Sequence, residues 1–196
     1  EEIEFVSSGN EFGFKLMQLL AESPYVKTIS RHASIPFHLY PEDPVNYNKV
    51  RKAIIQHRET LAHTSHEMTL LIYKAQIEAH KKGKEMPSVM ERFALESNFD
   101  IIKKVYGKEY LKQMIKHLQQ KIEQQNIQIY VVDEYVPMQV YISPKKVFLS
   151  IIHLGATTGV IIRSNRVVNL YEDLFSDMID RARPIGYYLN TMERSL

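Results

Sequence analysis

This chain of 196 residues has no cysteine and no large excess of either positive or negative charge. The lack of cysteine excludes a disulfide framework and thiolate chemistry and agrees with a reducing compartment, so we expect a cytoplasmic protein. The chain has 25 Lys and Arg against 23 Asp and Glu, which leaves a formal net charge of only +2. This balance gives no general attraction to nucleic acid or to an anionic membrane, and any basic surface has to be local.

Long apolar runs and glycine-rich loops are lacking as well. No apolar run approaches the roughly 18 to 20 residues of a membrane span. The first residues, "EEIEFVSSGNEFGF", have neither the basic start nor the apolar centre of a signal peptide, and we interpret them as the cut end of a longer protein. With only 7 glycines there is no phosphate-binding loop, and no Ser-x-x-Lys or Gly-x-Ser-x-Gly motif occurs. We therefore expect no cofactor and no membrane partner.

Apolar residues make up 44% of the chain, enough for a full core. Strands that alternate with helices and then follow one another as a meander predict an α/β fold, a mixed sheet flanked by helices. We assign residues 1–24 to a helical lead-in or linker and 25–196 to one domain with a helical insertion at about 76–125. The predicted elements are helix 10–23, strand 25–40, helix 44–66, strand 67–75, a polar loop from 76, helices 88–107 and 108–126, strands 127–133, 138–143, 146–152 and 159–164, and helix 166–182.

Apolar spacing supports several of these helices. Asn10 is the expected cap of the first helix. The run "EMTLLIYKA" (67–75) is nearly continuous and suits a strand covered on both faces. The expected buried positions are Phe12, Leu16, Leu19 and Leu20 in helix 10–23, Leu111, Met114, Ile115, Leu118 and Ile122 in helix 108–126, and Val167, Leu170, Tyr171, Leu174, Phe175, Met178 and Ile179 in helix 166–182.

Two stretches resemble a known family. "NIQIYVVDEYVPMQVYISPKKVFLSI" (126–151) is similar to the phospholipase D segment that gives a strand, the catalytic strand, a turn and another strand. "GVIIRSNRVVNLYEDLFSDMIDRARPI" (159–185) resembles the end of the ligand-sensing domains fused to helix-turn-helix regulators, such as the TrmB-type sugar-responsive regulators. The resemblance extends from about Val26 to Pro184 and implies a single phospholipase D-like domain that senses an effector and dimerises.

The chain departs from the active enzymes at the motif that carries their chemistry. Active members need H-x-K-x-x-x-x-D, in which His forms the phospho-intermediate and Lys neutralises the phosphate. With the His position at Gln139, Tyr141 stands at the Lys position and Lys146 at the Asp position. The alternative frame puts Pro137, Gln139 and Pro144 in the three places. Neither frame supplies a nucleophile, so we expect a protein that is not an enzyme.

The retained hairpin is instead expected to bind a ligand. Alternation places Gln139, Tyr141 and Ser143 on one face of the strand, and in this fold the strand ends converge on one cleft. His32 at the end of the first strand segment and Arg163 inside an apolar strand complete the candidate site. The candidate ligand-binding residues are thus His32, Gln139, Tyr141 and Arg163, and the expected ligand is a small polar or anionic metabolite.

Other constellations have simpler interpretations. His57, His63 and His66 fall within ten residues, but a polar helix end with solvated imidazoles explains them without a metal. "KKVYGKEYLK" (103–112) interleaves Lys with Tyr, as nucleic-acid binders do, yet it equally describes the exposed side of a helix.

We therefore expect the ligand-sensing and dimerising domain of a transcription regulator, which contacts DNA only through a segment outside this chain. A homodimer follows from the resemblance and from the twofold symmetry of palindromic DNA sites. The apolar stripes of the helices at 88–122 are its candidate seam. Two alternatives stay open, a phosphodiester hydrolase or nuclease that uses His32 or the His57–His66 group, and a protein-interaction module without a small ligand.

Overall fold

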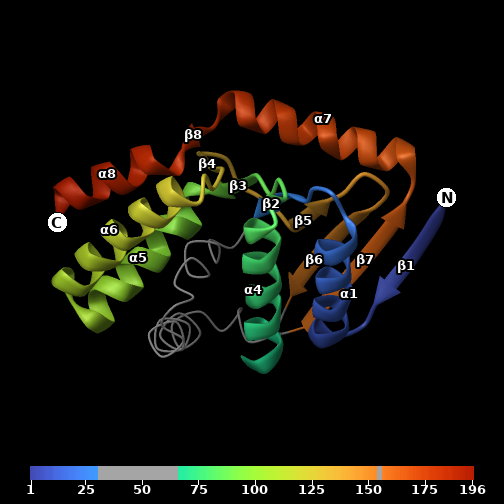
Figure 1. Cartoon of the computed structure of the whole chain (residues 1–196), viewed down its shortest axis with the longest axis horizontal. Helices are drawn as coiled ribbons and strands as arrows, with labels where there is room; N and C mark the ends of the chain where they lie inside the picture. Colours follow the sequence, from blue (N-terminus) through green and yellow to red (C-terminus); the bar gives the residue numbers. More distant parts are fainter. Residues whose placement is uncertain (31–65, 154–155) are drawn as a thin grey trace.

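The computed structural model describes residues 1–30, 66–153 and 156–196. Within these ranges eight strands form one sheet, and six helices surround it (Figure 1). The strands are β1 (Glu2–Val6), β2 (Lys27–Ser30), β3 (Ser88–Glu91), β4 (Ile129–Val132), β5 (Gln139–Ile142), β6 (Val147–His153), β7 (Ala156–Arg163) and β8 (Arg183–Pro184). The helices are α1 (Gly9–Glu22), α4 (His66–Lys81), α5 (Arg92–Tyr106), α6 (Lys108–Gln124), α7 (Asn165–Arg181) and α8 (Ile185–Ser195).

The sheet is mixed, with strand order β1-β7-β6-β5-β2-β3-β4-β8. Strands β2, β3 and β4 lie side by side and run parallel, and the other neighbouring pairs are antiparallel. Helices connect the parallel strands, whereas a corner and a tight turn connect β4, β5 and β6. The predicted α/β class, a mixed sheet flanked by helices, is confirmed.

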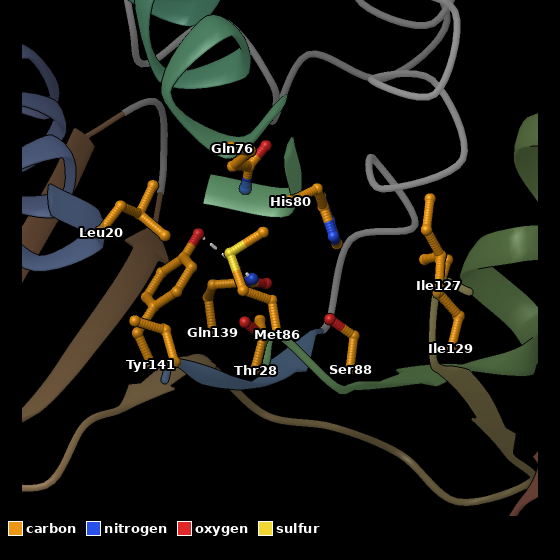
Figure 2. A pocket seen from close by; sticks show the side chains of 11 residues that line it. Leu20, Thr28, Gln76, His80, Met86, Ser88, Ile127, Ile129, Gln139 and Tyr141 are labelled. Carbon is orange, nitrogen blue, oxygen red and sulfur yellow. Dashed lines mark hydrogen bonds between the residues drawn. The ribbon is translucent and has the colours of Figure 1, made fainter. Parts of the chain in front are cut away.

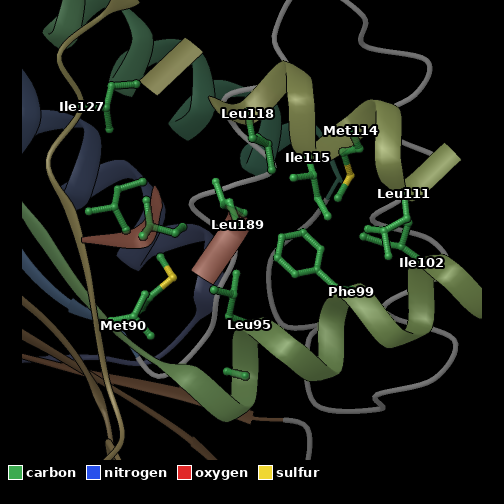
Figure 3. Packing of buried hydrophobic residues seen from close by; sticks show 14 residues of the cluster. Met90, Leu95, Phe99, Ile102, Leu111, Met114, Ile115, Leu118, Ile127 and Leu189 are labelled. Atoms are coloured by element: carbon green, nitrogen blue, oxygen red, sulfur yellow. The ribbon is translucent and has the colours of Figure 1, made fainter. Parts of the chain in front are cut away.

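Helices cover both faces of this sheet. On one face Phe175 and Met178 of α7 pack against a cluster that includes Ile29, Val140 and Ile142. On the opposite face two separate clusters form. One joins α1 to β6 and β7, and the other joins α5, α6 and α8 to β3 and β4 (Figure 3). On this opposite face, the middle of the sheet lies between the two apolar clusters.

Short polar residues and one glycine set the helix ends. The Oγ atoms of Ser8 and Ser164 accept hydrogen bonds from backbone N–H groups in the first turns of α1 and α7. Each serine therefore satisfies an amide that the helix itself leaves without a partner. Asn10, the predicted cap, lies inside α1 instead. Gly107 ends α5 with φ of 88°, a conformation that glycine adopts without strain, and the predicted stop there is confirmed.

The prediction of a strand at 67–75 is wrong, because these residues belong to α4. Met68 and Ala79 are buried, and Ile72 and Ala75 lie against the α1 cluster. Offsets of 0, 4, 7 and 11 describe one face of a helix. The apolar residues between these positions hide the period in the sequence, since a continuous apolar run fits a buried strand equally well.

A second correction concerns the start of the helical region after residue 88. Residues Ser88–Glu91 form β3, which pairs with β2 and β4 in the centre of the parallel part, and the helix begins only at Arg92. The region predicted as a helical insertion at about 76–125 therefore contains a central strand. A strand of four residues, buried throughout, is too short to reveal a period of two.

Both ends of the chain take part in the fold. Residues 1–24, expected as a helical lead-in, include β1, which pairs with β7, and α1, whose predicted apolar face is buried. The chain after 184, for which we predicted no element, forms α8, and Ile185 and Leu189 are buried against α5 and α6. Our sequence prediction missed β1, β8 and α8 because each is short or lacks a long repeat.

The predicted helices 108–126 and 166–182 correspond to α6 and α7. The stripe of α6 is buried as predicted, apart from Ile122, which is partly buried. In α7 the buried face is turned slightly, because Val168 is buried whereas Leu170 is 64% exposed and Leu174 42% exposed. No helix in the described ranges is long and apolar enough to cross a membrane.

Candidate ligand-binding site

Polar side chains occupy the middle of the sheet face between the two apolar clusters. The register aligns Thr28 of β2 with Tyr141 of β5 and with Ser88 of β3. Ser30 and Gln139 lie two residues further along the same strands, so alternation keeps them on the same face. A sheet centre normally carries apolar side chains, and this polar group is therefore a candidate for function.

Three of these side chains form a hydrogen-bond chain. Ser30, which is fully buried, donates from Oγ to Oε1 of Gln139 over 3.0 Å. Gln139 in turn donates from Nε2 to the phenol oxygen of Tyr141 over 3.3 Å (Figure 2). The two bonds fix the orientation of the Gln139 amide and leave the Tyr141 hydroxyl hydrogen available as a donor.

A small cavity of about 40 Å³ lies against this chain. Gln76 and His80 reach it from α4, opposite the strand residues, as Figure 2 shows. The volume holds a few water-sized groups. The cavity is lined by Leu20, Val26, Thr28, Gln76, His80, Met86, Ser88, Ile127, Ile129, Gln139 and Tyr141.

The part of the lining that the structure describes is electrically neutral near pH 7. None of the described residues that line the cavity is Asp, Glu, Lys or Arg. Burial lowers the pKa of His80, which favours its neutral form. Burial raises the pKa of Tyr141 to about 12, and the hydrogen bond from Gln139 offsets only part of this effect. The described lining thus offers hydrogen-bond donors and acceptors without a fixed charge.

Aromatic packing holds Tyr141 in place. The ring of Phe12 lies 6.1 Å from the ring of Tyr141 and 5.8 Å from that of Phe148, measured between centroids. Phe12 in turn lies over Gly159, where a Cβ atom would come within 2.5 Å of its ring. The position of α1 on the sheet therefore determines where the phenol of Tyr141 points.

Of the predicted site residues, Gln139 and Tyr141 come together and Arg163 does not join them. Arg163 lies at the end of β7 and forms ion pairs with Glu4 at 3.0 Å and Glu2 at 3.4 Å. The β7 residue in register with Gln139 is Gly159, two strands away and four residues, or about 13 Å, before Arg163. The two carboxylates of β1 supply the anionic partner that an arginine in this strand requires.

His32 lies outside the described residues, as do His57 and His63. Ser143 is buried and donates to the backbone oxygen of Lys146 across the turn, so it holds the hairpin together. In the described part of the chain no group of three or more His, Cys, Asp or Glu is arranged to hold a metal ion.

Sequence reasoning missed Gln76, His80 and Ser88. The first two were assigned to a loop and the third to the start of a helix. Neither assignment predicts a side chain that faces the middle of the sheet. The helical spacing of Met68, Ile72 and Ala79 is the signal that would have placed Gln76 and His80 on the inner side of α4.

Two larger cavities are present as well, and one of them adjoins the site cavity at His80 and Met86. One of about 290 Å³ separates the corner at 134–138 from α7 and is mainly apolar, with the Glu134–Arg181 ion pair among its lining residues. The other, of about 360 Å³, lies between the loops at 83–86 and 125–128 and is polar. Neither is lined by Gln139 or Tyr141.

Comparison with known proteins places the fold. No protein-family model matches the chain, and no curated protein matches its sequence. Among solved structures, TrmBL2, described as an archaeal chromatin protein with a novel mode of DNA binding, matches with a TM-score of 0.52 and 13% identity over 93% of this chain. Nuc from Salmonella typhimurium, a phospholipase D family member, matches with a TM-score of 0.51 and 9% identity, covering 93% of this chain and 97% of Nuc.

These matches support a phospholipase D-like fold with a structural relation to the TrmB-like protein. At such low identities the likeness concerns the fold alone. The chain spans 54% of the length of the TrmBL2 chain and nearly the whole of Nuc.

Proposed function

We propose that this chain is a non-catalytic ligand-binding domain of a transcription regulator. The observation that carries the proposal is the pair Gln139 and Tyr141. In one of the two frames of the resemblance, these positions correspond to the catalytic His and Lys of the phospholipase D motif, and in the other frame Gln139 stands at the Lys position. Here the two side chains hydrogen-bond to each other beside a neutral cavity. A phosphoryl-transfer site needs a nucleophile and a cation, and this pair supplies neither.

The ligand that suits this cavity is small, neutral and rich in hydroxyl or amide groups. Thr28, Ser88, Gln76 and the free hydroxyl hydrogen of Tyr141 surround it with donors and acceptors. The anionic ligand expected from the sequence rested on Arg163, which is neutralised by Glu2 and Glu4. The described lining offers no opposite charge to a charged ligand. Transfer of such a ligand from water into the cavity is therefore unfavourable.

In this proposal the segment that reads the DNA sequence lies outside this chain, and the domain acts as a homodimer. Twofold pairing suits a regulator because palindromic DNA sites require two copies in symmetric positions.

Thermal unfolding with a panel of small polar compounds tests the binding role. We expect one neutral compound to raise Tm clearly, because a ligand that binds only the folded state stabilises it. Calorimetry with that compound should then give a Kd at least about fivefold weaker for Gln139→Leu and for Tyr141→Phe, since each loses a hydrogen bond. Arg163→Gln is the control and should bind normally. Unchanged affinity in both cavity variants would place the site elsewhere.

Phosphodiester hydrolysis tests the absence of catalysis. We expect no turnover of a nitrophenyl phosphodiester or of DNA, with or without divalent metal ions. Robust turnover that is lost in His32→Ala or His63→Ala would overturn the proposal in favour of the hydrolase alternative.

A further inference from the structure

The helical hairpin of α5 and α6 concentrates the positive charge of the molecule. From Arg92 to Gln124 the chain has seven Lys and Arg against four Asp and Glu, a net charge of +3. The whole chain carries +2, so the remaining residues together carry −1. A local positive field therefore exists although the overall composition is nearly neutral.

Four lysines of this hairpin gather at its tip. Lys103 and Lys104 lie in the last turn of α5, and Lys108 and Lys112 lie one turn apart at the start of α6. Three of them are exposed, and Lys112 is half-buried. No ion pair involves these four side chains in the described part of the chain, and Glu109 is the one acidic residue between 103 and 112.

The hairpin extends away from the sheet, and Figure 1 shows its turn at the end of the molecule far from β1 and β7. The tip also contains the amino end of α6, which Gly107 caps without a side-chain hydrogen bond. Backbone N–H groups and the helix dipole attract anions at such an end. Here that attraction adds to the charge of the lysines around it.

The occupant that fits this tip is a phosphate backbone. An anionic membrane would also need an apolar face. The apolar stripes of α5 and α6 are turned inward, with Phe99, Ile102 and Met114 fully buried (Figure 3), and Val105 is a single exposed apolar side chain among the tip lysines. The cations are all lysines, which act as point charges, whereas arginine and amide side chains predominate in reading base edges. Contact with phosphates independent of sequence is therefore the expected mode.

We infer that the α5–α6 tip, through Lys103, Lys104, Lys108 and Lys112, binds the phosphodiester backbone of duplex DNA. The choice of DNA among polyanions rests on the proposed function, which places the protein next to DNA. The tip then adds a contact that holds the sensing domain against DNA beside a site read by another segment.

Fluorescence anisotropy with two unrelated labelled duplexes of about 30 base pairs tests this inference at about 50 to 200 mM salt. The variant has all four tip lysines replaced by Gln. The matched control has four exposed lysines replaced elsewhere, namely Lys74, Lys81, Lys82 and Lys145. Circular dichroism confirms that both variants are folded.

We expect the wild-type chain to bind both duplexes with similar Kd. The tip variant should lose at least about tenfold in affinity at low salt, and its slope of log K against log salt should fall by about 3 to 4, since each phosphate contact contributes about 0.9. The control variant should stay within about threefold of the wild type, because its lysines lie away from the contact.

Three results would overturn the inference: no binding by the wild-type chain at low salt, an equal loss in both variants, or much tighter binding to duplex RNA or to phosphatidylserine vesicles than to DNA. Because ligand binding in the Gln139 cavity is measured separately, these results would leave the sensing role standing. Conversely, failure of the cavity variants to change ligand affinity would not affect the DNA result.

Discussion

At the level of single residues, the hydrogen-bonding capacity of the cavity depends on two side chains, Gln139 and Tyr141. Both are neutral, and both can donate or accept hydrogen bonds. Alternation in the sequence predicted that they share one face, and the structure confirms it. Ser30, which donates to Gln139, could not be predicted, because a serine in a strand carries no signal of a shared site. His80, which lines the same cavity, was missed because its helix was taken for a loop.

Titration of Tyr141 gives a first prediction. Its folded pKa of about 12 exceeds the usual value of 10, so the neutral phenol stabilises the fold fully below pH 10. This contribution is lost as the pH rises through about 12, because the unfolded chain releases the proton first. Between pH 10 and 12 the wild type should therefore lose more of its free energy of unfolding than Tyr141→Phe does. The difference between the two losses should be on the order of 1 kcal/mol.

Denaturant unfolding at several alkaline pH values measures this difference. Tyr135→Phe serves as the control, since that ring is largely exposed, and it should follow the wild type. Equal pH dependence in Tyr141→Phe and the wild type would show that Tyr141 is not held in its neutral form.

At the level of elements, the sequence predicts a helix when its apolar residues repeat over several turns, and a strand when its apolar and polar residues alternate over several positions. The stripe of α6 spans more than two turns and was identified correctly. Strands β4 to β7 were also predicted, although β7 begins at Ala156, three residues before the predicted start at 159. In α4 and β3 the tertiary environment decides instead. A continuous apolar run fits either class, and four buried residues contain too few alternations to distinguish a strand from the first turn of a helix.

The packing of α1 on the sheet gives a second prediction. Gly159→Ala should lower the free energy of unfolding by about 1–3 kcal/mol, because the added Cβ meets the ring of Phe12 at 2.5 Å and Val6 at 3.1 Å. Displacement of Phe12 should also disturb Tyr141 and weaken ligand binding.

Gly186→Ala is the matched control. A Cβ atom there meets nothing within 4 Å, and alanine favours the helix, so the stability should rise slightly. Denaturant unfolding of both variants decides the matter. If Gly159→Ala is as stable as Gly186→Ala, then α1 does not press on the sheet as described.

At the level of the whole molecule, the resemblance of the last 60 or so residues was sufficient to indicate the architecture, but the arrangement of the apolar surface was not predictable. The stripes of the helices at 88–122 were expected to form a dimer seam. In the structure they are buried within one chain against β3, β4 and α8. The most exposed large apolar side chains in the described ranges include Ile3 and Phe5 on the edge strand β1 and Leu170 on α7, and among those of α5 only Phe93 and Val105 are exposed.

A homodimer nevertheless remains the third prediction, from the symmetry that a regulator of palindromic sites requires. Sedimentation equilibrium at micromolar concentration should give about twice the chain mass of 23.0 kDa. Phe5→Ser removes the most exposed large apolar ring among the described residues. If the edge of β1 contributes to the seam, this change should shift the equilibrium toward monomer. A strict monomer in the wild type would contradict the prediction.

The central claim is that the β5–β6 hairpin binds a ligand beside Gln139. The most direct test is an NMR titration of the side-chain amide signals with the compound that stabilises the protein most. The signals of Gln139 are identified by their absence in Gln139→Leu. Gln119, which bonds to Asn190 of α8 away from the cavity, is the internal control. We predict that the Gln139 signals shift and saturate with the ligand while those of Gln119 stay fixed. Saturable shifts at Gln119 with none at Gln139 would contradict the account.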